Sequence, residues 1–158
     1  MNPKFNVVLI GGTFDEFHKG HRALLFKAFE VGEHVMIGLS SDELAEKLKK
    51  NHLRAPYEQR LEELKNFLRK QGFLKRAEIV PLDSPYGVTL STTVAQAIVV
   101  SRETEPCTFD INEKRRARGL PPLKVVVIDM VPAEDTIPIS TTRIRHGEID
   151  REGRLLKP

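Results

Sequence analysis

The sequence predicts a single α/β domain of the Rossmann-like, doubly wound type, with a mostly parallel five-stranded sheet and helices on both faces. Five aliphatic runs bounded by turn-forming residues predict buried strands at residues 7–10, 35–39, 79–82, 97–100 and 125–130. Segments with helical periodicity lie between most of these runs, an alternation typical of a parallel sheet with crossover helices. The length of 158 residues suits one such domain, so we assign residues 1–158 to one unit.

The predicted helices of the first half begin and end at recognisable signals. The first spans residues 19–31, where apolar residues repeat with helical period, and Gly32 stands as its C-terminal stop. The second starts at Ser40, which has capping-box spacing to Glu43. The third spans residues 56–72, with proline first and glycine last, as helix termini prefer.

The second half of the chain gives weaker signals. Residues 83–93 are expected to form a loop, and residues 103–118 to be partly helical. Basic residues gather at the end of this helix, at positions 114–118, where the helix dipole favours cations without any ligand. Aromatic residues are not interleaved with these charges, so we expect no nucleic-acid partner.

Composition narrows the possible function further. The formal net charge is only +3, which suits a phosphate-bearing ligand. Cys107 is the only cysteine, which excludes an internal disulfide and a multi-thiolate zinc site and predicts a reducing, cytoplasmic location. No apolar stretch approaches the roughly 20 residues of a membrane span, so we expect no membrane partner.

The junction between the first strand and the first helix carries a candidate phosphate site. Gly11 and Gly12 would allow a sharp turn and a close approach to an anion, and the helix start would offer free amides. Thr13 could add its hydroxyl, and His18 and His21 lie three residues apart on one side of the first helical turn. The segment lacks the spacing of GxGxxG, GxxxxGK(S/T) and HExxH, which disfavours dinucleotide, P-loop and zinc sites.

A second anion site is predicted near the C-terminus. Ser140 or Thr141 could cap a new helix, and Arg143 would add a fork of N–H donors. The alternative is an ordinary capped helix over residues 142–150, with Arg145 and Glu148 paired on its surface. Spacing alone does not choose between the two interpretations.

Both segments resemble signatures of the HxGH nucleotidyltransferase superfamily, which transfers a nucleoside monophosphate from ATP or CTP to an acceptor. GGTFDEFHKGH is similar to its GTFDxxHxGH motif, and residues 139–143 resemble its ISSTxxR motif. Segments 99–104, 112–116, 119–123 and 126–131 extend the resemblance, over nearly the whole chain, to phosphopantetheine adenylyltransferases of the archaeal and eukaryotic type. Such enzymes join AMP from ATP to 4'-phosphopantetheine, giving 3'-dephospho-CoA and pyrophosphate in coenzyme A biosynthesis.

The resemblance implies roles for both motifs. Thr13 and the backbone of Gly12 and Phe14 would hold the reacting phosphates, His21 would stabilise the α-phosphate, and His18 would contact the departing β-phosphate. The β- and γ-phosphates would be clamped by Ser140, Thr141, Thr142 and Arg143. The acceptor phosphate is already anionic, so it can attack the α-phosphorus directly, without a covalent intermediate.

Further site residues follow from the resemblance. The superfamily uses a lysine after the second strand, for which we favour Lys50, with Lys47 next. Arg60 resembles an arginine of related cytidylyltransferases, although a packed side chain is its alternative role. Ser101 and Arg102 follow the fourth strand where bacterial relatives are arginine-rich, so acceptor contacts cannot be copied there. We expect Mg²⁺ to be held mainly by substrate phosphates, with no protein metal site, and the protein to be a monomer.

Three other functions stay open. The first is a cytidylyltransferase that acts on CTP and a phosphorylated alcohol such as glycerol phosphate. Such enzymes contain segments similar to residues 41–44 and to ISTTRIR of this chain. A nicotinamide mononucleotide adenylyltransferase is disfavoured, because its motif more often has arginine where this chain has Thr13. A nucleotide- or RNA-binding regulator is the non-enzymatic alternative.

Overall fold

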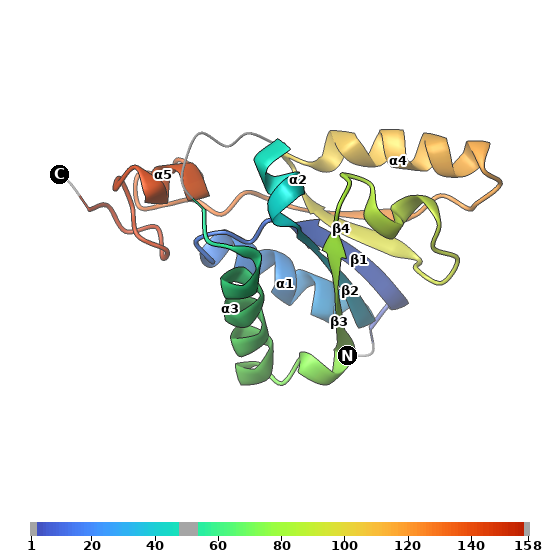
Figure 1. Cartoon of the computed structure of the whole chain (residues 1–158), viewed down its shortest axis with the longest axis horizontal. Coiled ribbons are helices and arrows are strands. Elements are labelled where there is room, and N and C mark those ends of the chain that lie inside the picture. The colour runs from blue at the N-terminus through green and yellow to red at the C-terminus, as the bar shows by residue number, and fades with distance from the viewer. Residues whose placement is uncertain (1–2, 48–53, 157–158) are drawn as a thin grey trace.

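The computed structural model describes residues 3–47 and 54–156, and its centre is a five-stranded parallel sheet (Figure 1). The sheet confirms the predicted fold class and all five predicted strands. Its spatial order is β3-β2-β1-β4-β5. The strands are β1 (Phe5–Gly12), β2 (Gly32–Ser40), β3 (Ala77–Leu82), β4 (Ala97–Ser101) and β5 (Lys124–Ile128).

Helices cover both faces of the sheet, as predicted. The helices are α1 (Lys19–Val31), α2 (Asp42–Lys47), α3 (Tyr57–Lys70), α4 (Glu105–Ala117) and α5 (Thr141–Arg145), with short 3-10 helices η1 (Leu74–Arg76) and η2 (Gly87–Leu90). In Figure 1, α4 and α3 lie on opposite sides of the sheet. No helix among the described residues is both long and apolar enough to span a bilayer.

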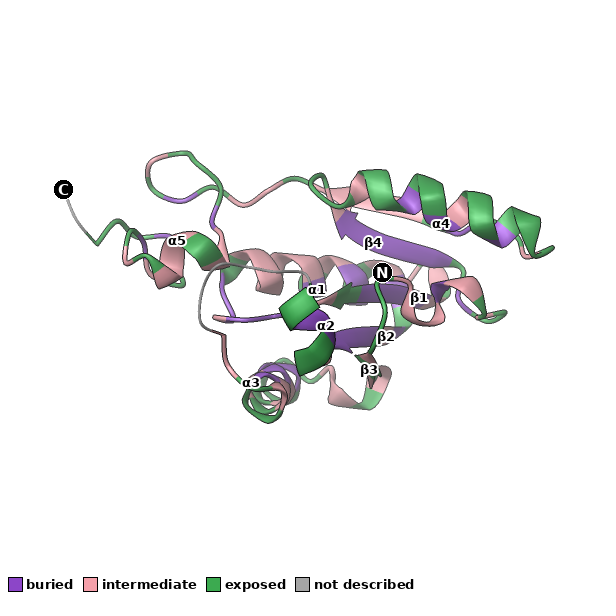
Figure 2. Ribbon diagram, turned by 45° about the horizontal axis from the view of Figure 1, so that its top comes forward, coloured by how far each residue is buried: buried purple, intermediate pink, exposed green. Residues whose placement is uncertain are grey.

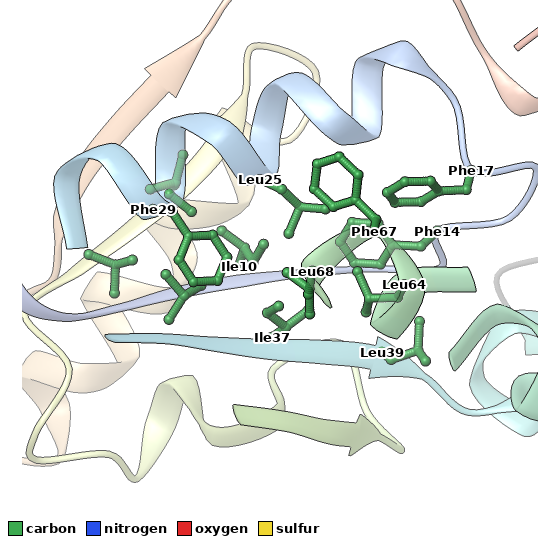
Figure 3. Close-up of a cluster of buried hydrophobic side chains, with 14 of the residues drawn as sticks. Ile10, Phe14, Phe17, Leu25, Phe29, Ile37, Leu39, Leu64, Phe67 and Leu68 are labelled. Carbon is green, nitrogen blue, oxygen red and sulfur yellow. The ribbon is translucent and has the colours of Figure 1, made fainter. Parts of the chain in front are cut away.

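One apolar core lies on each face of the sheet. The larger one packs Leu25 and Phe29 of α1 and Leu64 and Leu68 of α3 against β1 and β2 (Figure 3). The smaller one packs Ile111 of α4 against the other face of the sheet. Figure 2 shows β2 and β4 largely buried, the edge strand β3 partly exposed, and the outer surfaces of the helices exposed.

Several predicted boundaries are wrong in detail. Helix α2 is capped by Ser41, whose Oγ accepts a hydrogen bond from the amide of Leu44 at 3.1 Å, and Ser40 is the last residue of β2. The predicted loop at 83–93 contains η2. Gly32 does end α1, but in an extended conformation, because it is also the first residue of β2. Glycine is needed there because a Cβ would lie 2.6 Å from a methyl group of Val8.

The topology sets the position of the site. The chain turns from β1 to β2 on one side, and β4 pairs with the other side of β1. In open α/β sheets, ligands bind beyond the carboxyl ends of the strands at such a switch point. The first motif follows β1 at this edge, and Figure 1 shows α5 beside the start of α1.

Candidate active site

The two histidines of the first motif cap the start of α1 reciprocally. Nδ1 of His18 accepts hydrogen bonds from the amides of Gly20 at 3.0 Å and His21 at 3.4 Å. Nδ1 of His21 accepts one from the amide of His18 at 3.1 Å. This is a capping box in which imidazoles replace the usual hydroxyl and carboxylate. Both Nδ1 atoms act as acceptors, so in each neutral ring the proton is on Nε2.

The glycine between the two histidines is required by this arrangement. The rings of His18 and His21 stack with their centroids 3.7 Å apart. A Cβ on Gly20 would lie 2.9 Å from Cε1 and 3.0 Å from Nδ1 of His18. Any larger residue at position 20 would therefore displace the His18 ring.

Burial keeps the histidine pair uncharged. The pKa of His18 is lowered from 6.5 to about 4, chiefly by burial and then by the nearby charges of Arg22 and Arg151. The pKa of His21 is lowered well below 6.5, chiefly by burial and then by His18 and the same arginines. At neutral pH both rings are neutral, and each offers one Nε2–H donor.

The expectation of free amides at the start of α1 is wrong. The amide of Lys19 donates to the carbonyl of Arg151 at 2.9 Å, and the next two amides donate to His18. All three donors of the first turn are therefore already bonded within the protein. An anion at this point would be met by the imidazole Nε2–H groups rather than by the helix backbone.

The sharp turn of the motif also lies later than predicted. Gly11 and Gly12 are the extended end of β1. The left-handed residues are Phe14, with φ of 51°, and Glu16, with φ of 52°. The Phe14 ring is buried, with its centroid 5.3 Å from that of the His21 ring, so only its backbone could contact a ligand.

The second motif forms the start of α5 and contacts the first motif directly. Ser140 is the N-cap, and its Oγ accepts a hydrogen bond from the amide of Arg143 at 3.2 Å. The hydroxyl of Thr141 donates to the carbonyl of Asp15 at 2.9 Å, and Thr142 is exposed. The structure thus joins segments that are 126 residues apart in sequence.

The alternative C-terminal helix at 142–150 is wrong in length and in its ion pair. Helix α5 ends at Arg145, and Arg145 pairs with Asp15 and Glu16. Glu148 lies instead within 3.4 Å of Arg143 and 3.8 Å of His146. The C-terminal helix is therefore turned toward the first motif.

The two arginines of the second motif differ in their surroundings. Arg143 pairs with Asp135 at 2.5 Å and also donates to the carbonyls of Ile137 and Pro138. Arg145 reaches Asp15 of the first motif. The spacing of ISSTxxR, counted from Ile139, places its arginine at 145 rather than 143. Sequence reasoning therefore missed Arg145 although the signature's own spacing pointed to it.

Arg60 is a buried crosslink beneath the first motif. It is 1% exposed, and it donates to the carbonyls of Thr13 at 3.0 Å, Ser40 at 2.8 Å and Ala55 at 2.9 Å. It also pairs with Asp42 at 2.9 Å. This arrangement matches the packed role that sequence analysis gave as the alternative, and it ties the ends of β1 and β2 together.

The remaining predicted residues lie at the same edge of the sheet or outside the described region. Lys47 is the last residue of α2 and is exposed, whereas Lys50 lies outside the described residues. Ser101 ends β4, and the next residue, Arg102, is exposed and pairs with Asp129 at 2.5 Å.

Comparisons with known proteins agree with this geometry. The cytidylyltransferase-like family matches residues 9–147. The phosphopantetheine adenylyltransferase of Methanothermobacter thermautotrophicus is 50% identical over 157 residues, which cover 99% of this chain and 93% of that protein. The enzyme of the same name from Pyrococcus horikoshii is 41% identical, over 98% of both chains.

The chain belongs to the phosphopantetheine adenylyltransferases of the cytidylyltransferase-like family. A solved structure of an Archaeoglobus fulgidus protein of unknown function superposes with a TM-score of 0.70 at 34% identity, over 77% of this chain and 88% of that one. Pantoate-beta-alanine ligase from Francisella tularensis superposes with a TM-score of 0.59 at 9% identity, over 92% of this chain and 67% of that one. This second likeness shows a shared fold alone. In this adenylyltransferase family member, both motifs lie at the switch point of that fold.

Proposed function

We propose that this chain transfers AMP from ATP to 4'-phosphopantetheine, giving 3'-dephospho-CoA and pyrophosphate. The observation that carries the proposal is the identity of 41–50% to phosphopantetheine adenylyltransferases over nearly the full chain, a span that covers both motifs. The contact of Thr141 and Arg145 with Asp15 supports it, because one triphosphate could reach both motifs only if they lie together.

The reaction needs no nucleophile from the protein. An oxygen of the acceptor phosphate attacks the α-phosphorus of ATP and forms the new P–O bond. The bond from that phosphorus to the oxygen bridging to the β-phosphate breaks, and its electron pair leaves with pyrophosphate. The protein contributes positioning and hydrogen-bond donors that stabilise the five-coordinate α-phosphorus.

The neutral histidine pair supplies such donors. We expect Nε2–H of His21 to donate to the α-phosphate and Nε2–H of His18 to donate to the departing β-phosphate. Thr13 and the backbone of Gly12 and Phe14 would hold the reacting phosphates from the end of β1. The capping bonds fix both rings before substrate binds, so little reorganisation is needed during the reaction.

The second motif is expected to hold the β- and γ-phosphates. Thr142 is an exposed residue, the hydroxyl of Thr141 already donates to Asp15, and the side chain of Ser140 caps α5. Thr142 is therefore the most available hydroxyl. The guanidinium group of Arg143 would also bind these phosphates, in competition with Asp135.

The side chains around the two motifs suit a magnesium ion that is bound by the phosphates of the nucleotide. Among residues 3–47 and 54–156, no three His, Cys, Asp or Glu side chains are grouped so as to hold a metal. Both carboxylates of the first motif, Asp15 and Glu16, face Arg145. We expect Mg²⁺ to be held by triphosphate oxygens and water, and it would neutralise the charge of the triphosphate.

A pyrophosphate-release assay tests the proposal. Purified protein with Mg²⁺ is offered ATP or CTP, each with 4'-phosphopantetheine, glycerol 3-phosphate or nicotinamide mononucleotide. Release with ATP and 4'-phosphopantetheine alone is the expected result. Release only with CTP and glycerol 3-phosphate would instead assign a cytidylyltransferase, and nucleotide binding without release in any pairing would favour a regulator.

We also expect the protein to be a monomer. Sedimentation analysis of the same purified protein would check this expectation.

A further inference from the structure

Asp15 joins three segments of the candidate active site. It is 2% exposed, and its Oδ1 accepts hydrogen bonds from the amide of Ala55 at 2.9 Å and from Nη2 of Arg145 at 3.0 Å. Its Oδ2 lies 3.2 Å from the same Nη2. Its carbonyl accepts the hydroxyl hydrogen of Thr141 at 2.9 Å. One residue thus connects the first motif, the segment before α3 and the start of α5.

The backbone around Asp15 also indicates that these contacts have to be maintained. The residues on either side, Phe14 and Glu16, both have left-handed φ values. For residues other than glycine this conformation costs on the order of 1 kcal/mol each, and it persists only when the surroundings enforce it. The bonds made by Asp15 lie between the two strained residues, where they can enforce this conformation.

A direct role in the chemistry does not fit these contacts. Both carboxylate oxygens already face protein donors, and the side chain is buried. A substrate would have to displace Arg145 to reach them. The role of Asp15 must therefore act through the residues it holds.

We propose that Asp15 is a positioning residue that holds the histidine motif and α5 at the separation one triphosphate requires. The inference rests on the proposed function, in which the α-phosphate lies at His21, the β-phosphate lies between His18 and α5, and the γ-phosphate lies at α5. A ligand that spans both motifs depends on their separation. A ligand that occupies only one motif does not.

Binding of three ligands to wild-type protein and to Asp15→Asn tests this role. AMP carries only the phosphate expected at His21, pyrophosphate carries those expected at α5, of which the β-phosphate also meets His18, and ATP carries both sets. Asparagine keeps the size and the acceptor for Ala55, but its amide group places a donor against Arg145. We expect the Kd for ATP, measured by calorimetry without acceptor, to rise about tenfold or more, with the Kd for AMP changing less than about twofold and the Kd for pyrophosphate rising less than that for ATP.

Two further variants keep the test decisive. Ile111→Ala enlarges the core on the other face of the sheet, so it should lower stability while leaving the ratio of the three Kd values unchanged. If Asp15→Asn does not fold, Arg145→Lys carries the test, because this side chain is 24% exposed and its replacement keeps the charge. A selective loss of ATP binding is expected there as well. A loss of pyrophosphate binding in Arg145→Lys as large as the loss of ATP binding would instead show direct contact.

The possible failures can be told apart. An unchanged Kd for ATP in folded Asp15→Asn, or equal losses for all three ligands, would overturn the positioning role while the proposed function stands. Wild-type protein that releases no pyrophosphate from ATP and 4'-phosphopantetheine would overturn the proposed function, and this inference with it.

Discussion

The histidine pair makes the stability of the protein depend on pH in a way that one substitution can isolate. His18 is buried and has its pKa lowered to about 4, whereas an unfolded histidine titrates near 6.5. His18→Asn removes this titration. Asparagine is a favoured N-cap residue, so the variant can still accept the amide hydrogens of Gly20 and His21.

The sign and size of the effect follow from linkage. As pH falls through 6.5, the His18 side chain binds a proton in the unfolded chain, but in the folded chain it stays neutral until about pH 4. The unfolded state therefore holds more protons in this window, and stability is lost as pH falls. Between pH 7 and pH 5 the His18 contribution amounts to about 2 kcal/mol, which for a domain of this size corresponds to roughly 4–8 °C in Tm.

Thermal unfolding of wild-type protein and His18→Asn across pH 7 to 5 measures this contribution. As pH falls, the Tm of the wild-type protein should decrease more steeply than the Tm of His18→Asn. Between pH 7 and pH 5 the Tm of the variant should rise by roughly 4–8 °C relative to that of the wild type. His34→Asn, at an exposed position on β2, is the matched control and should follow the wild-type curve. Parallel curves for wild type and His18→Asn would show that His18 is not a buried neutral cap, and the argument about neutral donors would be lost.

Four other substitutions test the site. His21→Ala should lower kcat about a hundredfold with a smaller change in ATP affinity, and an unchanged kcat in steady-state assays would remove His21 from its role. Thr142→Ala should mainly raise the KM for ATP, with no change in Tm, because Ser140 rather than Thr142 caps α5. Gly20→Ala should lower kcat more than tenfold, because the added Cβ displaces the His18 ring, even though alanine has the higher helix propensity. A crystal structure of the variant would show the displaced ring. Arg60→Met should lower the free energy of unfolding, measured in urea, by about 3 kcal/mol, because it leaves buried carbonyls unpaired. An unchanged free energy of unfolding would contradict the role of Arg60 as a buried crosslink.

Most of the fold was predictable because local pattern and tertiary structure agree. The buried aliphatic runs are the strands, and the apolar stripe of residues 19–31 is α1 to the residue. The errors have two sources. Helix α5 stops at Arg145 through a local signal that sequence analysis missed: Gly147 has a left-handed φ of 75°, and the amides of Gly147 and Glu148 donate to the carbonyls of Ile144 and Arg143. The pairing of Arg145 with Asp15 is different, because no local pattern encodes a partner 130 residues away.

The site was predictable as a pair of motifs, but their contact was not. The spacing of His18 and His21 identifies the first turn of α1, yet it does not show that each ring bonds the other's backbone. Likewise, the first amide of α1 is bonded by the carbonyl of Arg151, which only the folded C-terminal segment brings there. The local bonds between ring and backbone, together with the long-range bond from Lys19 to Arg151, hold the two imidazoles in place at the helix start.

The charge pattern of the site then explains how a protein of net charge +3 could bind a triphosphate. The arginines around the first motif are already paired: Arg22 with Glu152, Arg145 with Asp15, and Arg151 with Glu16 and Glu63. Paired arginines attract an anion weakly at a distance, but they hold the backbone segments that carry the other donors. Recognition would therefore depend on fixed donors at short range, chiefly the two imidazole Nε2–H groups, rather than on a strong positive field. Such donors need little reorganisation as charge develops on the α-phosphate, which is the condition under which they stabilise a transition state best.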